Sequence, residues 1–243
     1  ETRSSIASTV GKYIAIKREG DSADPLFKFS WIMDQLEQNN IRGAFYFITG
    51  HTSPLDGDYS IQSQRMHKLL DQIHRRGHEI GLHTSYNSAQ EPMLISEEFD
   101  RLKDVCHSLN IEQEKWGGRQ HYLRWVPTKT WTDWDCAGLN YDTTLGYADQ
   151  IGFRAGTMFD YPVYDLVKRK KLKLLERPLS IMETTLFSSN YMNITEYDQA
   201  QVAMMEIITS CKLLNGPTSL LWHNNNLVTA DSQDLFKFII SSM

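Results

Sequence analysis

The chain has 243 residues, of which 41% are hydrophobic and 23% are charged, an ordinary globular balance that excludes a disordered chain. The 25 Lys and Arg residues against 30 Asp and Glu give a net charge of −5, which argues against nucleic acid as a partner. No apolar run reaches the ~18 residues that a membrane span needs. Three widely spaced cysteines, Cys106, Cys136 and Cys211, form no disulfide framework, so we expect a reducing compartment and slightly prefer the cytoplasm. The chain begins at Glu1, so we expect any targeting segment to precede this sequence.

Segments typical of strands and helices alternate along the chain. The first half predicts a strand over Lys12–Glu19, a helix over Phe27–Asn39, a strand over Gly43–Ile48, a helix over Ile61–Arg75, a strand over His78–His83 and a helix over Ser96–Leu109. The second half predicts a strand over Trp116–Arg119, a helix over Thr130–Cys136, strands near Tyr141, near Phe153 and over Lys171–Met182 with an interruption at Pro178, a helix over Glu196–Leu213, a strand over Ser219–His223 and a helix over Leu235–Ile240. Gly77 and Gly138 are expected to end helices, and Ser96 to cap one.

This alternation predicts a mostly parallel sheet covered by helices, in a single α/β domain over residues 1–243. About seven such units suit a barrel-like sheet, in which chemistry sits on the loops after the carboxyl ends of the strands. Polar residues recur at those predicted positions: Asp21, Asp24, His83, Arg119, His121 and His223. We therefore expect these side chains to share one site.

The strongest local pattern is RGHEIGLHTSYN, over Arg76–Asn87. It resembles the second motif of the polysaccharide deacetylase family (NodB homology, carbohydrate esterase family four), G-H-E-I-G-x-H-[ST]-x-x-H. Four more segments resemble the other family motifs, in the same order, and a fifth resembles a family strand: Asp21–Pro25, Gly118–Arg124, Tyr141–Asp142, Leu220–His223 and Ile41–Phe47. The resemblance covers nearly the whole chain and implies a distorted (β/α)7-type barrel.

The resemblance also implies an activity, the hydrolysis of N-acetyl groups on an amino sugar of a polysaccharide, for example during surface-glycan assembly. In this family a divalent metal, usually zinc, is held by one Asp and two His and activates water. Carried over position by position, Asp21 would be the general base, His223 the general acid, and Arg119 would orient the base. His83 and the residues at positions 23 and 87 would hold the metal. Three aromatic residues near these motifs, Tyr86, Tyr122 and Trp222, are candidates for contact with a carbohydrate.

Two metal positions depart from the family pattern. Position 23 is Ala, which cannot bind a metal, and Asn87 offers an amide oxygen where zinc favours imidazole. Two nearby residues are candidates to complete the site, Asp24 by turning inward and His121 by replacing the lost imidazole. Three readings stay open: an active deacetylase, a metal-free relative that binds a glycan or partner without turnover, and a hydrolase of non-sugar C–N bonds.

Other classes find less support in the sequence. There is no G-x-S-x-G for a hydrolase serine and no glycine-rich phosphate loop after the first strand. The basic run Lys168–Lys173 is interpreted as a solvated face, because it is short and lies in an acidic chain.

Overall fold

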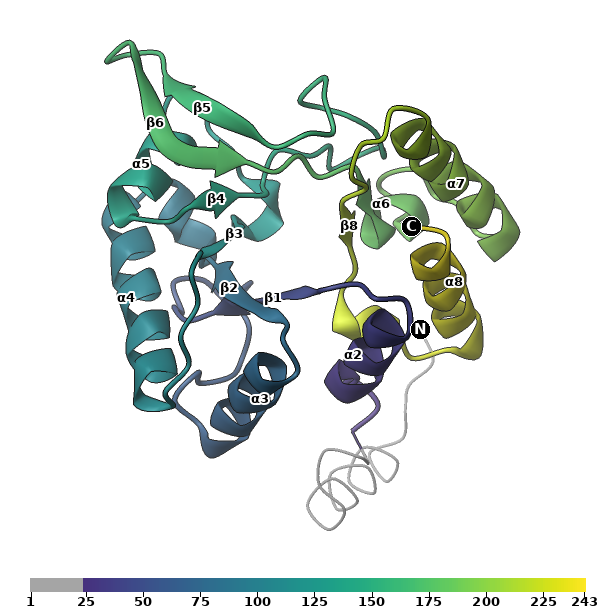
Figure 1. Cartoon of the computed structure of the whole chain (residues 1–243), viewed down its shortest axis with the longest axis horizontal. Coiled ribbons are helices and arrows are strands. Elements are labelled where there is room, and N and C mark those ends of the chain that lie inside the picture. The colour runs from purple at the N-terminus through teal and green to yellow at the C-terminus, as the bar shows by residue number, and fades with distance from the viewer. Residues whose placement is uncertain (1–23) are drawn as a thin grey trace.

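The computed structural model describes residues 24–243 (Figure 1). The predicted strand Lys12–Glu19 and the site candidates Asp21 and Ala23 lie outside the described residues. The helices are α2 (Phe29–Gln38), α3 (Gln64–Arg75), α4 (Pro92–Ser108), α5 (Thr130–Ala137), α6 (Glu183–Phe187), α7 (Tyr197–Leu213) and α8 (Ala230–Ser241). The strands are β1 (Ala44–Ile48), β2 (Glu79–His83), β3 (Gly117–Arg119), β4 (Tyr141–Asp142), β5 (Tyr161–Asp165), β6 (Lys170–Glu176), β7 (Ile181–Met182) and β8 (Leu220–Leu221).

The described strands form two hydrogen-bonded sheets. The larger sheet has the order β1-β2-β3-β4-β6-β5, in which all neighbours are parallel except the edge pair β5 and β6. The smaller sheet is the parallel pair β7-β8. The predicted mixed α/β class with a parallel sheet is therefore confirmed. Between residues 24 and 243, the two sheets stay separate ladders and do not join into one continuous ring of strands.

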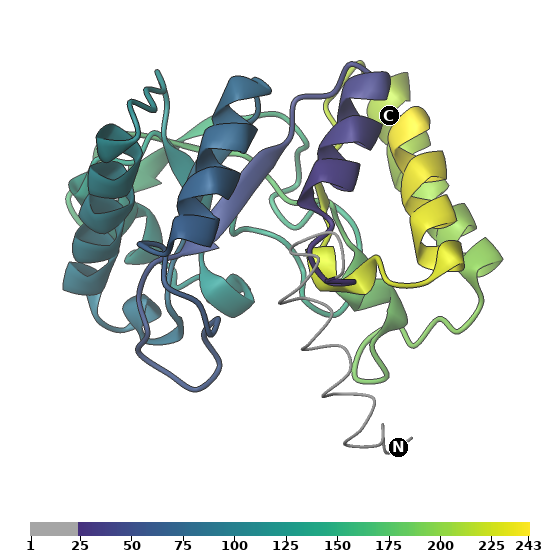
Figure 2. The ribbon, with the colours of Figure 1, turned by 90° about the horizontal axis from the view of Figure 1, so that it is seen from below.

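Apolar helix faces hold the sheets in place. The largest core lies between the six-stranded sheet and α3, α4 and α5, and it centres on the fully buried Trp134, Leu70 and Ile80. A second core joins α6, α7 and α8 to the smaller sheet, and a third joins α2 to α8. Figure 2 shows α3 and α4 over one sheet face and α2 beside α8 on the other side of the molecule. No helix in residues 24–243 combines the length and apolar character needed to cross a membrane.

Several local signals act as predicted. Gly77 and Gly138 have φ values of +78° and +85°, the left-handed conformation that ends α3 and α5 and that glycine adopts without strain. Helix α3 gains an N-terminal cap, because the Ser63 side chain accepts a hydrogen bond from the Met66 amide. Thr229 and Ser232 form a reciprocal capping box at the start of α8.

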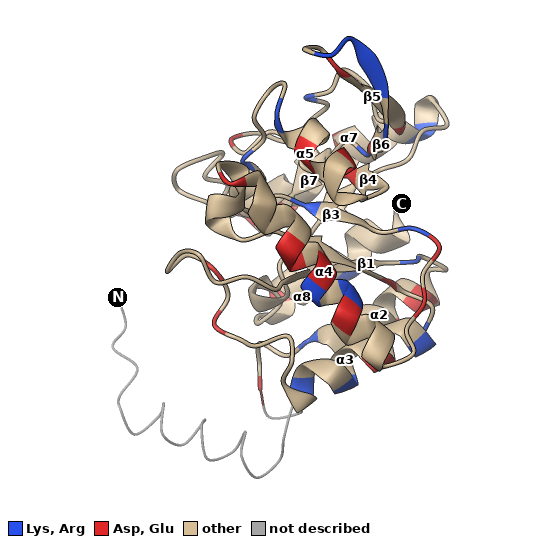
Figure 3. Cartoon of the chain, turned by 90° about the vertical axis from the view of Figure 1, so that its left-hand side faces the viewer, with Lys and Arg blue, Asp and Glu red and all other residues tan. Residues whose placement is uncertain are grey.

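Other predicted elements are wrong. The helix predicted to start at the Ser96 cap begins at Pro92, since proline fits the first helical turn, where its missing N–H is not needed. No strand forms at Phe153, which lies in a loop. The chain instead forms a strand at Tyr161–Asp165, which pairs with β6 as an antiparallel hairpin. The alternating pattern of YPVYD is short, and Pro162 argues against a strand in the sequence. Proline is tolerated here because β5 lies at the edge of the sheet. Figure 3 shows Lys and Arg gathered on this hairpin.

We predict that Gly118→Ala destabilises the protein by about 3 kcal/mol or more. An added Cβ would meet the backbone carbonyl of Leu82 on the neighbouring strand, and a backbone atom cannot rotate away. Urea unfolding monitored by circular dichroism measures the change in the free energy of unfolding. Val202→Ala, at an exposed position of α7, is the control and should change it by less than ~0.5 kcal/mol. An unchanged midpoint for Gly118→Ala would contradict the tight β2–β3 approach.

Candidate functional site

Two strand ends place the first two site candidates next to each other. His83 is the last residue of β2 and Arg119 the last residue of β3, and the two residues are directly paired in the parallel ladder. His121 follows two residues after Arg119, on the loop that leaves β3. The carboxyl ends of these strands therefore bring His83 and His121 together, and their ring centroids lie 4.9 Å apart.

The His83 ring is held in one orientation and is uncharged. Its Nδ1 lies 2.8 Å from the backbone carbonyl oxygen of Arg119, which accepts the Nδ1 proton. Nε2 is then the nitrogen that carries the lone pair. Burial is the main cause that lowers the pKa of His83 to about 3, so the ring stays neutral near pH 7.

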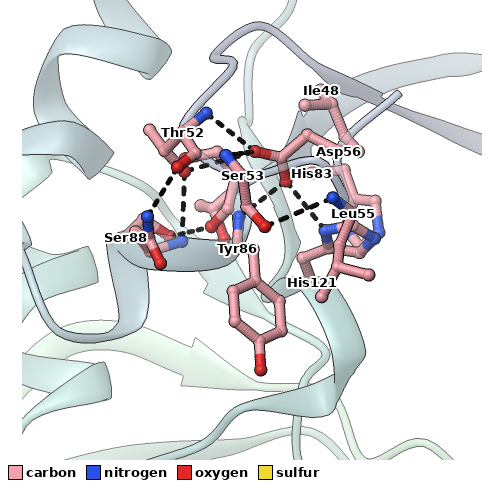
Figure 4. Close-up of polar contacts among 12 residues, drawn as sticks. Ile48, Thr52, Ser53, Leu55, Asp56, His83, Tyr86, Ser88 and His121 are labelled. Carbon is pink, nitrogen blue, oxygen red and sulfur yellow. Dashed lines mark hydrogen bonds and ion pairs between the residues drawn. The ribbon is translucent and has the colours of Figure 1, made fainter. Parts of the chain in front are cut away.

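His121 is held in the same way by a carboxylate. Its Nδ1 lies 3.1 Å from Oδ1 of Asp56, whose side chain is fully buried. Asp56 also accepts hydrogen bonds from the backbone amides of Thr52, Ser53 and Tyr86, at 2.7–2.9 Å (Figure 4). Burial raises the pKa of Asp56, but these donors outweigh burial and leave its pKa below the usual value. A charged acceptor on Nδ1 leaves the lone pair of His121 on Nε2.

Burial lowers the pKa of His121, and the Asp56 carboxylate opposes that shift without reversing it. The described site therefore holds two adjacent neutral imidazoles, each bound through Nδ1 to a fixed acceptor. Each ring keeps a lone pair on Nε2, which is the chemistry of a metal-ligand pair with its outer hydrogen bonds in place.

The loop after His121 is strained and exposes an aromatic ring. Tyr122 and Leu123 both have positive φ values, +57° and +50°, which non-glycine residues adopt at a cost. Tyr122 is 58% exposed. Its ring lies 4.7 Å from the His121 ring and 5.5 Å from the ring of Tyr86. Tyr86 also contacts the His121 ring and the Arg124 guanidinium. The two tyrosines thus form an aromatic wall beside the histidines.

The other two proposed metal ligands are engaged elsewhere. The Asn87 side-chain amide donates to the Thr52 carbonyl at 2.6 Å. The Asp24 carboxylate forms a 2.9 Å ion pair with Arg65. Among residues 24–243, no three His, Cys, Asp or Glu side chains are grouped to hold a metal ion. Of the two sequence candidates for completing the site, the structure therefore sets His121, and not Asp24, beside His83.

Arg119 lies under this site as a buried cation. It is 8% exposed, and its Nε donates to the Thr143 carbonyl at 3.0 Å. Two buried carboxyls face it from paired positions on β4 and β6, Asp142 and Glu176. Burial raises the pKa of Asp142 to about 6, and burial together with the Asp142 charge raises the pKa of Glu176 well above its usual value. The contact of Arg119 with Asp21, implied by the family resemblance, lies outside the described residues.

His223 enters the site from the smaller sheet with its own carboxylate partner. Its Nδ1 lies 2.7 Å from Oε1 of Glu183, the first residue of α6. The same oxygen accepts from the His223 amide and from the Asn226 side chain. Burial raises the pKa of Glu183, but the hydrogen bonds and charge of His223 outweigh burial and leave it below the usual value. A positive charge on His223 would make a minor contribution to lowering the pKa of both His83 and His121.

Trp222 has a different position from the two tyrosines. Its ring packs edge-on against Phe236, with 5.2 Å between the centroids, among the apolar residues of the second and third cores. The described contacts of Trp222 are those of a residue that packs α8 against β8.

Sequence reasoning missed Asp56 and Glu183, the carboxylates that hold His121 and His223. Asp56 stands in SPLDG, a pattern that indicates no more than a turn, and its ring partner is 65 residues away. Glu183 follows a short strand with no motif around it. A search for acidic residues just after predicted strands would have found Glu183 but not Asp56.

No protein-family model matches the chain, and no curated protein matches it. Among solved structures, a candidate polysaccharide deacetylase from Mycobacterium smegmatis matches with a TM-score of 0.64 and 15% identity, covering 89% of this chain and 70% of that one. An allantoinase matches with a TM-score of 0.58 and 15% identity, over 90% and 68% of the two chains. A candidate polysaccharide deacetylase from Pseudomonas aeruginosa PAO1 matches with a TM-score of 0.52 and 12% identity, over 90% and 69%.

These matches define the class of fold. The chain has the fold shared by polysaccharide deacetylases and an allantoinase, as its motifs predicted. At 12–15% sequence identity these matches support the fold alone, and the activity depends on the residues of the site.

We predict that His83 keeps the nitrogen chemical shifts of a neutral, Nδ1-protonated ring from pH 8 down to pH 5. The physical reason is burial, which lowers its pKa to about 3. The measurement is a 15N NMR titration of the side chain, with His83→Gln to assign the signal. A ring that gains its second proton near the ordinary value of ~6.5 would contradict this environment.

The same shift has a consequence for stability. An unfolded histidine binds a proton below pH ~6.5, whereas His83 in the folded state does not until about pH 3. The contribution of His83 to the free energy of unfolding is thus complete above pH 6.5 and declines as the pH falls below it. The decline should be shallower in His83→Gln, measured by urea unfolding at several pH values.

Proposed function

We propose that this protein is a metal-dependent hydrolase that removes N-acetyl groups from an amino sugar of a polysaccharide, the reaction implied by its motif resemblance. The observation that carries the proposal is the His83–His121 pair. Two neutral imidazoles lie 4.9 Å apart, and each is held through Nδ1 by a fixed acceptor. Structural histidines need no such matched pair of free Nε2 atoms.

The residues of this pair fit a zinc ion in donor type. Zinc favours neutral imidazole, and ligating histidines usually donate their second ring proton to a carboxylate or a backbone carbonyl. His121 meets the first kind of acceptor in Asp56, and His83 meets the second in Arg119. In this proposal His121 supplies the imidazole that Asn87 does not. Asp21, outside the described residues, is the remaining carboxylate that the motif resemblance places at the site.

The chain's own residues would divide the proton transfers. When bound, the metal would polarise the acetyl carbonyl and lower the pKa of a water molecule. Asp21 would take the proton of that water. His223 would protonate the leaving amine from Nε2, because Glu183 accepts the hydrogen bond from Nδ1 and fixes the orientation of the ring. This assigns Glu183 as a positioning residue.

The exposed ring of Tyr122 and the neighbouring Tyr86 would supply a surface for the sugar. The apolar face of a pyranose ring packs well against aromatic rings, and Tyr122 is exposed directly beside His121. We assign substrate contact to these two residues.

We predict that the protein binds zinc and that His121→Ala weakens binding at least ~100-fold. Asp56→Asn should weaken it by ~10–100-fold, since loss of an outer-shell carboxylate has that effect. Isothermal titration with zinc of metal-stripped protein measures both. His107→Ala, which removes an exposed histidine of α4, is the matched control and should bind zinc like the wild type.

The zinc titration also distinguishes the proposed hydrolase from a second candidate function, the binding of a glycan without a metal. Ala23 and the engaged Asn87 favour a protein that has lost the metal and binds a glycan without turnover. Zinc binding unaffected by His121→Ala would contradict the assigned pair. Absence of zinc binding, together with binding of an N-acetylated oligosaccharide that is released intact, would establish the non-catalytic function instead.

We predict that Glu183→Gln lowers kcat by ~10–100-fold. A neutral amide accepts the Nδ1 hydrogen bond of His223 less strongly than the carboxylate does, so the ring is no longer fixed for transfer of its proton to the leaving amine. Acetate release from N-acetylglucosamine oligomers measures kcat. An unchanged kcat, or a loss that urea unfolding attributes to a less stable fold, would indicate a merely structural role for Glu183.

The structural likeness to an allantoinase favours one further assay. Allantoin should be tested beside the oligosaccharide, because its ring opening is hydrolysis of a C–N bond outside sugar chemistry. Turnover of allantoin, without release of acetate from the oligosaccharide, would replace the proposed substrate class while keeping the same catalytic groups.

A further inference from the structure

The β5–β6 hairpin is a surface that the proposed reaction does not use. It stands at the antiparallel edge of the larger sheet and extends away from the body of the molecule (Figure 1). Its tip carries Leu166 and Val167, which are 66% and 74% exposed. Exposing two adjacent aliphatic side chains to water costs free energy, and a partner that covers them would remove this cost.

Positive charge surrounds this apolar tip. Five cationic residues lie within six positions after Val167, all of them exposed: Lys168, Arg169, Lys170, Lys171 and Lys173. None of the five forms a salt bridge with another residue of the described part of the chain. Figure 3 shows the resulting basic stripe, on a protein whose net charge is −5. The charge is thus concentrated locally, against the sign of the whole chain.

The tip is built to a fixed shape. The buried Asp165 side chain accepts hydrogen bonds from the amides of Val167 and Lys168, both at 2.9 Å. Leu172 and Leu174 on β6 anchor the other face of the hairpin in the main core. Tyr164 pairs with Lys171 on the open face and is 46% exposed. A preorganised turn presents its side chains without the entropy cost of ordering a free loop.

We propose that the β5–β6 hairpin docks the protein on an anionic membrane surface, with Leu166 and Val167 inserted at the interface and the five cations on lipid phosphates. Charge complementarity indicates that the partner is a polyanion. The aliphatic tip favours a lipid surface over a soluble polyanion, because a soluble polyanion has no apolar region in which the two side chains could be buried. Tyr164 fits the same interface, where aromatic rings with a polar end are favoured.

The test is co-sedimentation of the full chain with vesicles of equal parts phosphatidylglycerol and phosphatidylcholine. We expect binding to these vesicles, weaker binding at high salt, and none to pure phosphatidylcholine. The triple variant Lys168→Gln, Arg169→Asn, Lys170→Gln should bind ~100-fold more weakly, since each cation near the surface contributes about fivefold. Asparagine at position 169 suits the left-handed backbone there, where φ is +51°.

The double variant Leu166→Ser, Val167→Ser should lose ~10-fold or more in vesicle binding. Two controls make matched changes elsewhere. One is Val202→Ser with Leu213→Ser on α7, and the other removes three cations at exposed positions by Arg42→Asn, Lys115→Gln and Lys212→Gln. Both should bind vesicles like the wild type.

Three outcomes would overturn the proposal. The first is no binding to the anionic vesicles, and the second is equal loss in the hairpin variants and their controls. The third is that the protein binds soluble heparin, that the triple variant weakens this binding, and that the double variant weakens binding to neither heparin nor the vesicles. That result would assign the hairpin to an acidic polymer. Zinc binding and acetate release are measured separately, so failure here leaves the proposed reaction untouched.

Discussion

The direct pairing of His83 with Arg119 across β2 and β3 is the constraint on which the site depends. It places the carbonyl of Arg119 where His83 Nδ1 can donate to it, and it directs the Arg119 side chain toward the next strand end at Thr143. Such close approach of two strands is possible because Gly118 has no side chain to meet the Leu82 carbonyl. A shift of one residue would reverse the faces of every side chain on β3 and separate the two histidines.

Much of this architecture could be predicted from local patterns. The apolar periodicity of α3, the glycines that end α3 and α5, and the short buried strand before His83 all act within a few residues of one another. The convergence of His83, Arg119 and His121 could be predicted as well, because parallel strands bring their carboxyl ends to one edge. The edge hairpin could not, since its first strand is short and carries Pro162.

The carboxylate partners of the histidines depend on distant contacts and have no local signature. Asp56 meets His121 across 65 residues, and Glu183 meets His223 across 40. Whether Asp24 turns toward His83 or toward Arg65 is likewise decided by where α3 places that arginine. A motif specifies which residue types are available, whereas the packing of helices and loops decides which of them meet.

One loop connects Asn87 to the support of His121. Under the proposed function, His121 supplies from the end of β3 the imidazole that Asn87 does not, and its ring lies 4.9 Å from that of His83. Asn87 in turn fastens the Thr52 loop, which contributes to holding Asp56 in place beside His121. Asn87 and His121 therefore depend on the same loop, and replacing Asn87 by His would disturb the support of His121.

The paired left-handed residues Tyr122 and Leu123 have a consequence for evolution in the laboratory. Each such conformation costs on the order of 1 kcal/mol or more in a non-glycine residue, and glycine or asparagine at position 122 would relieve part of it. Selection for heat resistance alone would then favour discarding the exposed ring beside His121. Libraries screened only for folding would lose Tyr122 and gain stability, whereas screens for the proposed carbohydrate binding would keep the strained turn.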